Sequence, residues 1–186
     1  MSVYNIILKR RSIRKFENKP VEKEKLEKMV NAARVAPSGA NLQPLKYIAV
    51  TTPSLCEKIF GLTKYAGYLK DWNPTEADQP RAYIVVLQDM AISKNQLDAG
   101  AAIENIILTA LEDGIASCWV GSFDRAGLMK TLNIDETMEI NSVVALGYPA
   151  QQSEEAEFCG DVKYFMDENG DFHVPKRPMS EVFKIM

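Results

Sequence analysis

The chain has 186 residues, of which 46% are hydrophobic and 25% charged, a composition that excludes a disordered or fibrous protein. Its 22 Lys and Arg against 25 Asp and Glu give a formal charge of −3, which disfavours a surface built to bind nucleic acid. This length predicts one domain that spans residues 1–186.

Cysteine usage and the N-terminal segment predict a cytoplasmic protein. Three cysteines without a CxxC pair form neither a disulfide framework nor a zinc cluster, and the single histidine adds no ligand spacing, so we expect no metal. The segment MSVYNIILKRRSIRKF carries a short apolar stretch before its basic residues, the reverse of a secretory signal. Since no stretch reaches the ~18 apolar residues of a membrane span, we expect no membrane partner.

The first part of the chain predicts two helices that flank a basic cluster. A short helix is expected over 3–9 and an amphipathic helix over 22–34. Between them, five basic residues fall within positions 9–15, and charges so close repel one another unless an anion lies among them. The RRSxR pattern at 10–14 combines forked guanidinium donors with a hydroxyl, which suits a terminal phosphate. A solvated basic face or a targeting patch is the alternative.

The segment APSGANLQP at 36–44 lies between the second helix and a strand predicted over 47–50. Two prolines bracket small residues and the carboxamides Asn41 and Gln43, and a carboxamide both donates and accepts, which suits the edge of a heterocycle. An ordinary helix-to-strand connection explains the prolines and the glycine, but it explains Asn41 and Gln43 less well.

The middle of the chain predicts a helix from Ser54 through Phe60, a long loop or lid over 65–80 and a buried strand over 82–87. The strongest helix follows over 96–113 and is closed by Gly114. Apolar residues cover most of its circumference, so we expect this helix to be buried against a second subunit. A central core helix of a monomer is the alternative.

A further buried strand is predicted over 116–120, and it runs into a turn at Gly121, where a backbone without a side chain allows close approach of a ligand. Cys118 as a nucleophile would need His173, the only histidine, and a strand cysteine usually belongs to the core. We therefore assign Cys118 no catalytic role. Another strand is expected over 140–146.

The last part of the chain predicts a helix over 124–132 capped by its aspartate, a two-residue hairpin turn at Asn169-Gly170 and a short helix over 180–185. Between the turn and the last helix, Lys176 and Arg177 stand between two prolines, a rigid placement of positive charge that suggests an anion. Helices and strands interleave along the whole chain, so the fold class is α+β, with crossovers that permit some parallel pairing.

Five blocks of the sequence, taken in order, resemble the FMN-dependent nitroreductase family. They are RRSIRKF at 10–16, APSGANLQP at 36–44, GIASCWVGSF at 114–123, LGYP at 146–149 and PKRPMSEVF at 175–183. Each block alone is weak, whereas together they cover essentially the whole chain in the family's order. The resemblance implies a nitroreductase-like fold with a central mixed β-sheet flanked by helices, in an intertwined homodimer that binds two FMN molecules at its interface.

The resemblance also implies roles for individual residues. Cofactor contacts would come from the basic segment, from the 36–44 loop reaching the partner's FMN, from the 119–121 strand end and from the C-terminal cations: Arg10, Arg11, Ser12, Arg14, Pro37, Ser38, Gly39, Asn41, Gln43, Trp119, Val120, Gly121, Lys176 and Arg177. No side chain is implied as a catalytic acid or base, because the flavin N5 atom carries the hydride beside the backbone of Val120 and Gly121. The poorly aligned 65–80 segment would line the substrate mouth with Tyr65, Tyr68, Trp72 and Asn73.

The activity that the resemblance implies is a ping-pong exchange, in which hydride passes from NAD(P)H to FMN and two electrons then pass to a nitroaromatic, a quinone or a similar small molecule. Two departures blur the choice of acceptor: Leu45 stands where an aromatic is more frequent, and Gly121 stands where some members place an acidic residue. The alternatives are a specialised branch, such as a flavin reductase, reductive dehalogenase or flavin-fragmenting enzyme, a non-catalytic flavin-binding protein, and an anion-binding interaction module.

Overall fold

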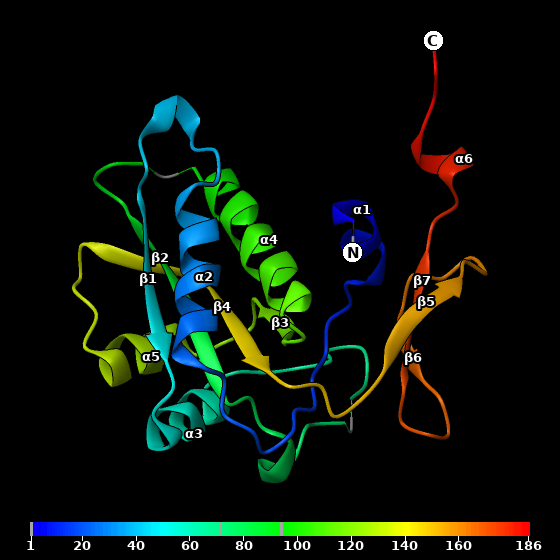
Figure 1. Ribbon diagram of the computed structural model, residues 1–186, viewed down its shortest axis with the longest axis horizontal. Helices are drawn as coiled ribbons and strands as arrows, with labels where there is room; N and C mark the ends of the chain where they lie inside the picture. Colours follow the sequence, from blue (N-terminus) through cyan, green and yellow to red (C-terminus); the bar gives the residue numbers. More distant parts are fainter. Residues whose placement is uncertain (1, 71, 94) are drawn as a thin grey trace.

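Helices and strands alternate along the chain, which confirms the α+β class (Figure 1). The computed structural model describes residues 2–70, 72–93 and 95–186. The helices are α1 (Val3–Lys9), α2 (Lys23–Arg34), α3 (Pro53–Gly61), α4 (Leu97–Glu112), α5 (Arg125–Leu132) and α6 (Met179–Val182). The strands are β1 (Leu45–Val50), β2 (Ala82–Asp89), β3 (Ala116–Val120), β4 (Met138–Gly147), β5 (Ser153–Glu157), β6 (Phe165–Met166) and β7 (Phe172–Lys176).

The main sheet has the strand order β1-β2-β4-β3, and every neighbouring pair in it is antiparallel. The expected mixed sheet is therefore corrected for these four strands. The crossover through α4 carries the chain from β2 to β3, but β4 inserts between them, so these two strands never pair. Across residues 2–70, 72–93 and 95–186, the parallel pairing with this sheet is an isolated bridge between Ser12 and Ser117.

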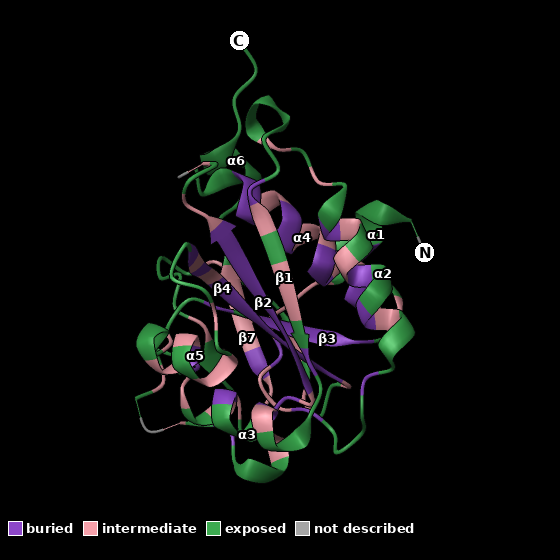
Figure 2. Cartoon of the chain, turned by 90° about the vertical axis from the view of Figure 1, so that its left-hand side faces the viewer, coloured by how far each residue is buried: buried purple, intermediate pink, exposed green. Residues whose placement is uncertain are grey.

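Two helical layers cover the main sheet and bury its central strands (Figure 2). On one face, α2 and α4 pack against alternate residues of β2 and β4, such as Ile84 and Val144. On the other face, α3 and α5 pack against the intervening residues, such as Val85 and Val143. Strand β2 and the second half of β4 are therefore continuous apolar runs, because both of their faces lie in the core.

Helix α4 is buried on a broad face but not all round. Seven of its residues are buried, whereas a stripe along the opposite side remains half-exposed or exposed: Leu97, Gly100, Ala101, Glu104, Leu108 and Leu111. Their three- and four-residue spacing keeps them on one side of the helix. One subunit therefore leaves a narrow, mostly apolar strip of its central helix uncovered.

Local sequence signals explain where some of the helices begin or end. Asp124 caps α5 by accepting a hydrogen bond from the Gly127 N–H at 3.0 Å, as predicted. Gly114 ends the α4 segment with a φ of +74°, a conformation that favours glycine. The expected Ser54 cap of α3 is wrong: Thr52 precedes this helix and Pro53 starts it, because proline fits the first helical position.

A second sheet of three strands, in the order β5-β7-β6, lies beside the main body (Figure 1). Strand β5 pairs with β7 in parallel, and β6 pairs with β7 antiparallel. The hairpin between Met166 and Phe172 has a five-residue loop instead of the predicted two-residue turn, because the Asp167 side chain accepts hydrogen bonds from the N–H groups of Asn169 and Asp171. Beyond this sheet, α6 and the C-terminal residues extend away from the body. Among the described residues, no helix is long and apolar enough to cross a membrane.

Candidate functional site

The basic segment over 9–15 is fixed along the outer edge of β3. The Ile13 N–H donates to the Ser117 carbonyl at 2.9 Å, and the side chains of Ile13 and Phe16 are buried. Phe16 packs against the backbone of Gly147, where an added Cβ would lie 2.8 Å from the ring. The buried side chains of Ile13 and Phe16 thus fix the position of this segment, and its polar side chains can contact other groups.

A cavity of about 340 Å³ lies between this segment, the second half of α4 and the chain just after β4. Its wall combines apolar residues with polar and basic ones: Lys9, Arg10, Arg11, Ile13, Ile107, Leu111, Gly114, Ile115, Ala116, Ser117, Pro149, Gln151, Gln152 and Ser153. Three buried donors in this wall have no hydrogen-bond partner among the described residues: Arg11 Nε, Gln151 Nε2 and Ser153 Oγ. A buried donor without an acceptor costs about 1–3 kcal/mol, so this wall suits a ligand that supplies oxygen atoms.

Arg11 and Gln151 are held in place by the partners that they do have. Arg11 is nine-tenths buried, with 9% of its side chain exposed, and it donates to Glu155 at 2.8 Å. The Gln151 side-chain oxygen accepts from the backbone N–H groups of Arg14 and Lys15 at 2.7 and 2.8 Å, so its amide nitrogen is directed elsewhere. Gln151 and Ser153 were not predicted, because neither belongs to a motif and only the fold brings them to Arg11.

The other predicted residues of the basic segment have different surroundings. The Arg10 Nε atom lies 3.8 Å from the Glu104 Oε1 atom of α4, within the range of an ion pair. The Arg14 guanidinium lies over the rings of Tyr164 and Phe172, at 4.7 and 4.9 Å from their centroids. Burial raises the pKa of the nearby Cys118 thiol while the charge of Arg14 opposes that rise. Cys118 is therefore a buried, neutral core residue.

The 36–44 loop is tied to the start of α4. The Ser38 hydroxyl donates to one oxygen of Asp98 at 2.6 Å, and the Gly39 N–H donates to the other at 3.1 Å. The Gln43 N–H in turn donates to the Ser38 hydroxyl at 2.9 Å. Ala40, Asn41 and Gln43 adopt positive φ angles near 50°, and Pro37, Gly39, Asn41 and Gln43 are exposed. Asp98 thus fixes the loop, in which Asn41 and Gln43 are exposed. No local motif predicted this role of Asp98.

This loop and the basic segment lie at opposite ends of α4 (Figure 1). Asp98 binds the loop near the first residue of the helix, whereas Leu111 near its last residue lines the cavity beside Arg11. Thirteen residues of α-helix separate these two ends by about 20 Å. A single chain therefore does not bring the two predicted groups of cofactor contacts together.

The strand end at 119–121 presents a fixed indole and an open backbone. Trp119 is 43% exposed, and its Nε1 donates a hydrogen bond to the Ser142 hydroxyl at 2.9 Å. Its ring lies 4.0 Å from the position that a Cβ on Gly100 would occupy. Val120 is buried, whereas Gly121 is exposed. The backbone of Gly121 is thus accessible at the point where β3 ends.

The C-terminal cations do not reach the cavity of the same chain. Lys176 is exposed at the end of β7, and Arg177 pairs with Glu181 at 2.8 Å while lying over Phe158. Neither residue lines the cavity beside Arg11. A single chain therefore does not bring Lys176 or Arg177 to the cavity where the other predicted phosphate contacts lie.

The predicted substrate residues separate into a core residue and three surface residues. Tyr65 is buried among core side chains and accepts a hydrogen bond from Thr63, and burial raises its pKa to about 12. Its place at a substrate mouth is therefore corrected. Tyr68 is exposed and lies against Tyr164, Trp72 is half-buried against Phe172, and Asn73 is exposed.

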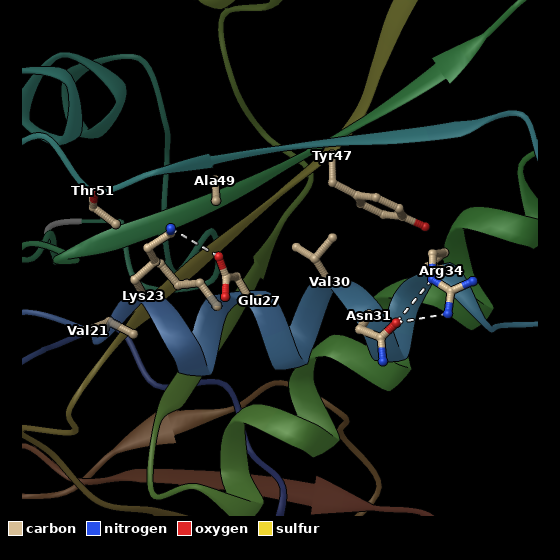
Figure 3. Close-up of a pocket in the computed structure, with 10 residues that line it drawn as sticks. Val21, Lys23, Glu27, Val30, Asn31, Arg34, Tyr47, Ala49 and Thr51 are labelled. Atoms are coloured by element: carbon tan, nitrogen blue, oxygen red, sulfur yellow. Dashed lines mark hydrogen bonds and ion pairs between the residues drawn. The ribbon is translucent and has the colours of Figure 1, made fainter.

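A larger groove of about 630 Å³ lies between α2 and β1, and none of the predicted site residues lines it (Figure 3). Its floor is apolar, with Leu26, Val30, Tyr47 and Ala49 among its residues. Its rim carries an ion pair between Lys23 and Glu27 at 3.3 Å. Strand β1 pairs only with β2 among the described residues, so its outer edge beside this groove offers open backbone groups.

Comparison with known proteins gives a consistent result. The profile of the Nitroreductase family matches residues 7–148. A protein of Archaeoglobus fulgidus named "Putative NADH dehydrogenase/NAD(P)H nitroreductase" is 34% identical over 158 residues, which cover 80% of this chain and 86% of the relative. A crystal structure of a protein of the same name from Bacteroides thetaiotaomicron has a TM-score of 0.72 and 28% identity, with 86% of this chain and 92% of that chain covered. An FMN-dependent nitroreductase of Clostridium difficile has a TM-score of 0.68 and 27% identity, with 85% and 93% covered.

Proposed function

The chain belongs to the nitroreductase family, and we propose that it is an NAD(P)H-dependent oxidoreductase that binds FMN and works as a homodimer of single-domain subunits. The proposed acceptor is a nitroaromatic, a quinone or a similar small molecule. The absence of a disulfide among the three cysteines, all of which lie in described parts of the chain, favours the cytoplasm as its compartment.

The observation that carries this proposal is the set of unpaired donors around the cavity beside Arg11. Arg11 Nε, Gln151 Nε2 and Ser153 Oγ lack acceptors among the described residues, and Arg10 and Lys9 add positive charge to the same wall. A phosphate monoester supplies both oxygen acceptors and negative charge, so the donor set fits the phosphate end of FMN. Small adjustments of these side chains would convert buried, unpaired donors into charge-assisted contacts.

Bound FMN would supply hydride acceptance at its N5 atom and electron transfer to the second substrate. The chain's own residues then need only bind and orient the cofactor. The open backbone at Gly121 allows close approach at the strand end, and Trp119, held by Ser142, gives that place a rigid wall. Cations of the basic segment would stabilise the negative charge of a reduced flavin. This division of labour explains an enzyme without a catalytic acid–base pair.

The homodimer is supported by the separation of the two groups of predicted contacts. The Asp98-held loop and the cavity beside Arg11 lie at opposite ends of α4, about 20 Å apart. A two-fold axis that crosses two copies of α4 in opposite directions would bring the loop of one protomer to the cavity of the other. The uncovered stripe of α4 and the exposed apolar residues of α1, Val3, Tyr4, Ile7 and Leu8, supply the contact surface.

The C-terminal segment also supports an intertwined assembly. Residues 179–186 extend from the body and expose Met179, Val182, Phe183, Ile185 and Met186 (Figure 1). The apolar groove between α2 and β1 borders an open strand edge, which accepts an extended segment by adding a strand (Figure 3). We infer that this groove receives the C-terminal segment of the second copy.

The test is the behaviour of the purified protein toward FMN and a reduced nicotinamide. We expect a yellow protein, or a colourless one that turns yellow on adding FMN, whose colour bleaches anaerobically with NADH or NADPH and returns with a quinone or nitroaromatic. Bleaching without return would favour a flavin-binding protein that lacks turnover. A protein that takes up no FMN would overturn the proposal.

A further inference from the structure

The side chain of Arg14 lies against two aromatic rings of the C-terminal region, Tyr164 just before β6 and Phe172 in β7. Its guanidinium carbon lies 4.7 Å from the ring centroid of Tyr164 and 4.9 Å from that of Phe172. These two rings lie 5.8 Å apart and tilt by 42° relative to each other. Tyr164 and Phe172 thus present two adjacent aromatic faces to one side of this cation, and we call this pair the aromatic clamp.

The clamp holds the charge of Arg14 without neutralising it. Within the described ranges, no carboxylate pairs with this guanidinium, whereas Arg10 and Arg11 each have a glutamate partner. An aromatic face attracts a cation through its quadrupole and carries no net charge. Arg14 therefore keeps its full charge, and the one acceptor that its guanidinium meets in the described parts of the chain is the Ser12 carbonyl at 3.4 Å.

The clamp is itself supported from behind. Phe172 is fully buried, and Trp72 meets it edge-on at 5.2 Å. The Tyr164 hydroxyl accepts from the Tyr68 N–H at 3.3 Å, and the two tyrosine rings lie 5.0 Å apart. The 65–80 loop therefore packs against the two rings that contact Arg14.

We propose that Tyr164 and Phe172 are positioning residues that orient Arg14 toward FMN and preserve its charge for the cofactor. This inference rests on the proposed function, because it assumes that Arg14 contacts FMN. Neither ring needs to touch the cofactor. Tyr164 and Phe172, for which the sequence predicted no role, would then tune cofactor binding from outside the cofactor pocket.

The test is a double-mutant cycle on the full chain with FMN affinity as the measurement. Tyr164→Leu removes the aromatic face from a half-buried position, and Tyr164→Phe is the matched control that keeps it. We expect Tyr164→Leu to weaken FMN binding about 3- to 30-fold, the range for a partly desolvated cation–π contact, and Tyr164→Phe to stay within about twofold. In an Arg14→Ala background, Tyr164→Leu should change the affinity less than about twofold.

A second readout separates positioning from general destabilisation. If the clamp directs a cation toward the flavin, Tyr164→Leu and Arg14→Ala should both lower the reduction potential of bound FMN, and Tyr164→Phe should not. Equal effects of Tyr164→Leu with and without Arg14, or an unchanged potential, would overturn the clamp. Unchanged FMN affinity in Arg14→Ala would overturn it at the first step, and failure of the wild-type chain to bind FMN would reject the proposed function itself.

Discussion

The four-stranded body and the C-terminal region over 150–186 are built on different principles. In the body, both faces of β2 and β4 are covered, and most of the buried side chains belong to two continuous clusters. In the C-terminal region, Phe172 alone among the described residues is a buried hydrophobic, and the strands β5 and β6 are largely exposed. The body is stabilised by its own hydrophobic core, whereas the C-terminal region is stabilised mainly by its contacts with the rest of the chain.

The contacts of the C-terminal region converge on the basic segment. Glu155 pairs with Arg11, Gln151 accepts from the backbone of Arg14, and Tyr164 lies over the Arg14 side chain. The region thus contributes little core but arranges the cations that are proposed to meet FMN. This difference indicates that stability resides in the body and that the proposed binding of FMN depends on the contacts between the two regions.

The largest expected effect is a loss of stability from a substitution in the core of the body. Ile106→Ala removes a fully buried side chain of α4 and should lower the free energy of unfolding by about 2–5 kcal/mol, the usual range for such a cavity. Phe165→Ala on exposed β6 should change it by less than about 0.5 kcal/mol. Urea unfolding followed by circular dichroism measures both, and similar losses at the two positions would contradict the contrast.

Removal of residues 179–186 should act on assembly and leave the fold of the body intact. The exposed apolar side chains of this segment have no partner groove in their own described chain, so their loss should shift the protein from dimer toward monomer. Sedimentation velocity over a concentration series measures the shift. As a matched control, Glu181→Gln within the full chain should leave the dimer in place, and a truncated chain that dimerises like wild type would refute the groove assignment.

Arg11→Ala should weaken FMN binding at the join between the regions by about 1.5–3 kcal/mol, because it removes a charged donor from the cavity wall. Lys15→Ala changes a cation of the same segment that does not line the cavity and should have a smaller effect. Fluorescence titration of FMN gives both affinities. Equal losses would show that only the summed positive charge of the segment matters.

The smallest expected effect concerns the pH response of the second sheet. Hydrogen bonds from His173 and then from the Asp171 N–H hold the pKa of Asp167 below its usual value near 3.8. A lowered pKa in the folded state means that this stabilisation is present above the usual value and is lost as the pH falls through the lowered one. The amide resonances of Asn169 and Asp171 should therefore shift below pH 4, and Asp167→Asn should abolish that step. A step that persists in the variant would assign it to another carboxylate.

The sequence predicted the elements whose signals are local. The bounds predicted for strand β3 and helix α1 match the observed ones, because apolar residues close together in the sequence indicate both elements. Strand β5 was missed because its sequence, SEEAE, has no apolar alternation and is stabilised only by pairing with β7.

Residues that act through tertiary contacts could not be predicted in the same way. Asp98 and Gln151 bind partners that lie 59 to 137 positions away in the sequence. Ser153 belongs to the site only because the fold places it in the wall of the cavity. Tyr65 is predicted at a substrate mouth because the 65–80 segment aligns poorly with the family's blocks, yet burial places its side chain in the core. The position of a loop in the sequence does not reveal which of its side chains turn inward.

The central claim, that this chain binds FMN through the join between the two regions, is tested most directly by FMN titration of the wild type and the Arg11→Ala variant, followed by anaerobic addition of NADPH or NADH. The account predicts saturable FMN binding to the wild type, one FMN per chain, bleaching by the reduced nicotinamide and clearly weaker binding by the variant. Absence of FMN binding to the wild type, or equal affinity of the two proteins, would contradict it.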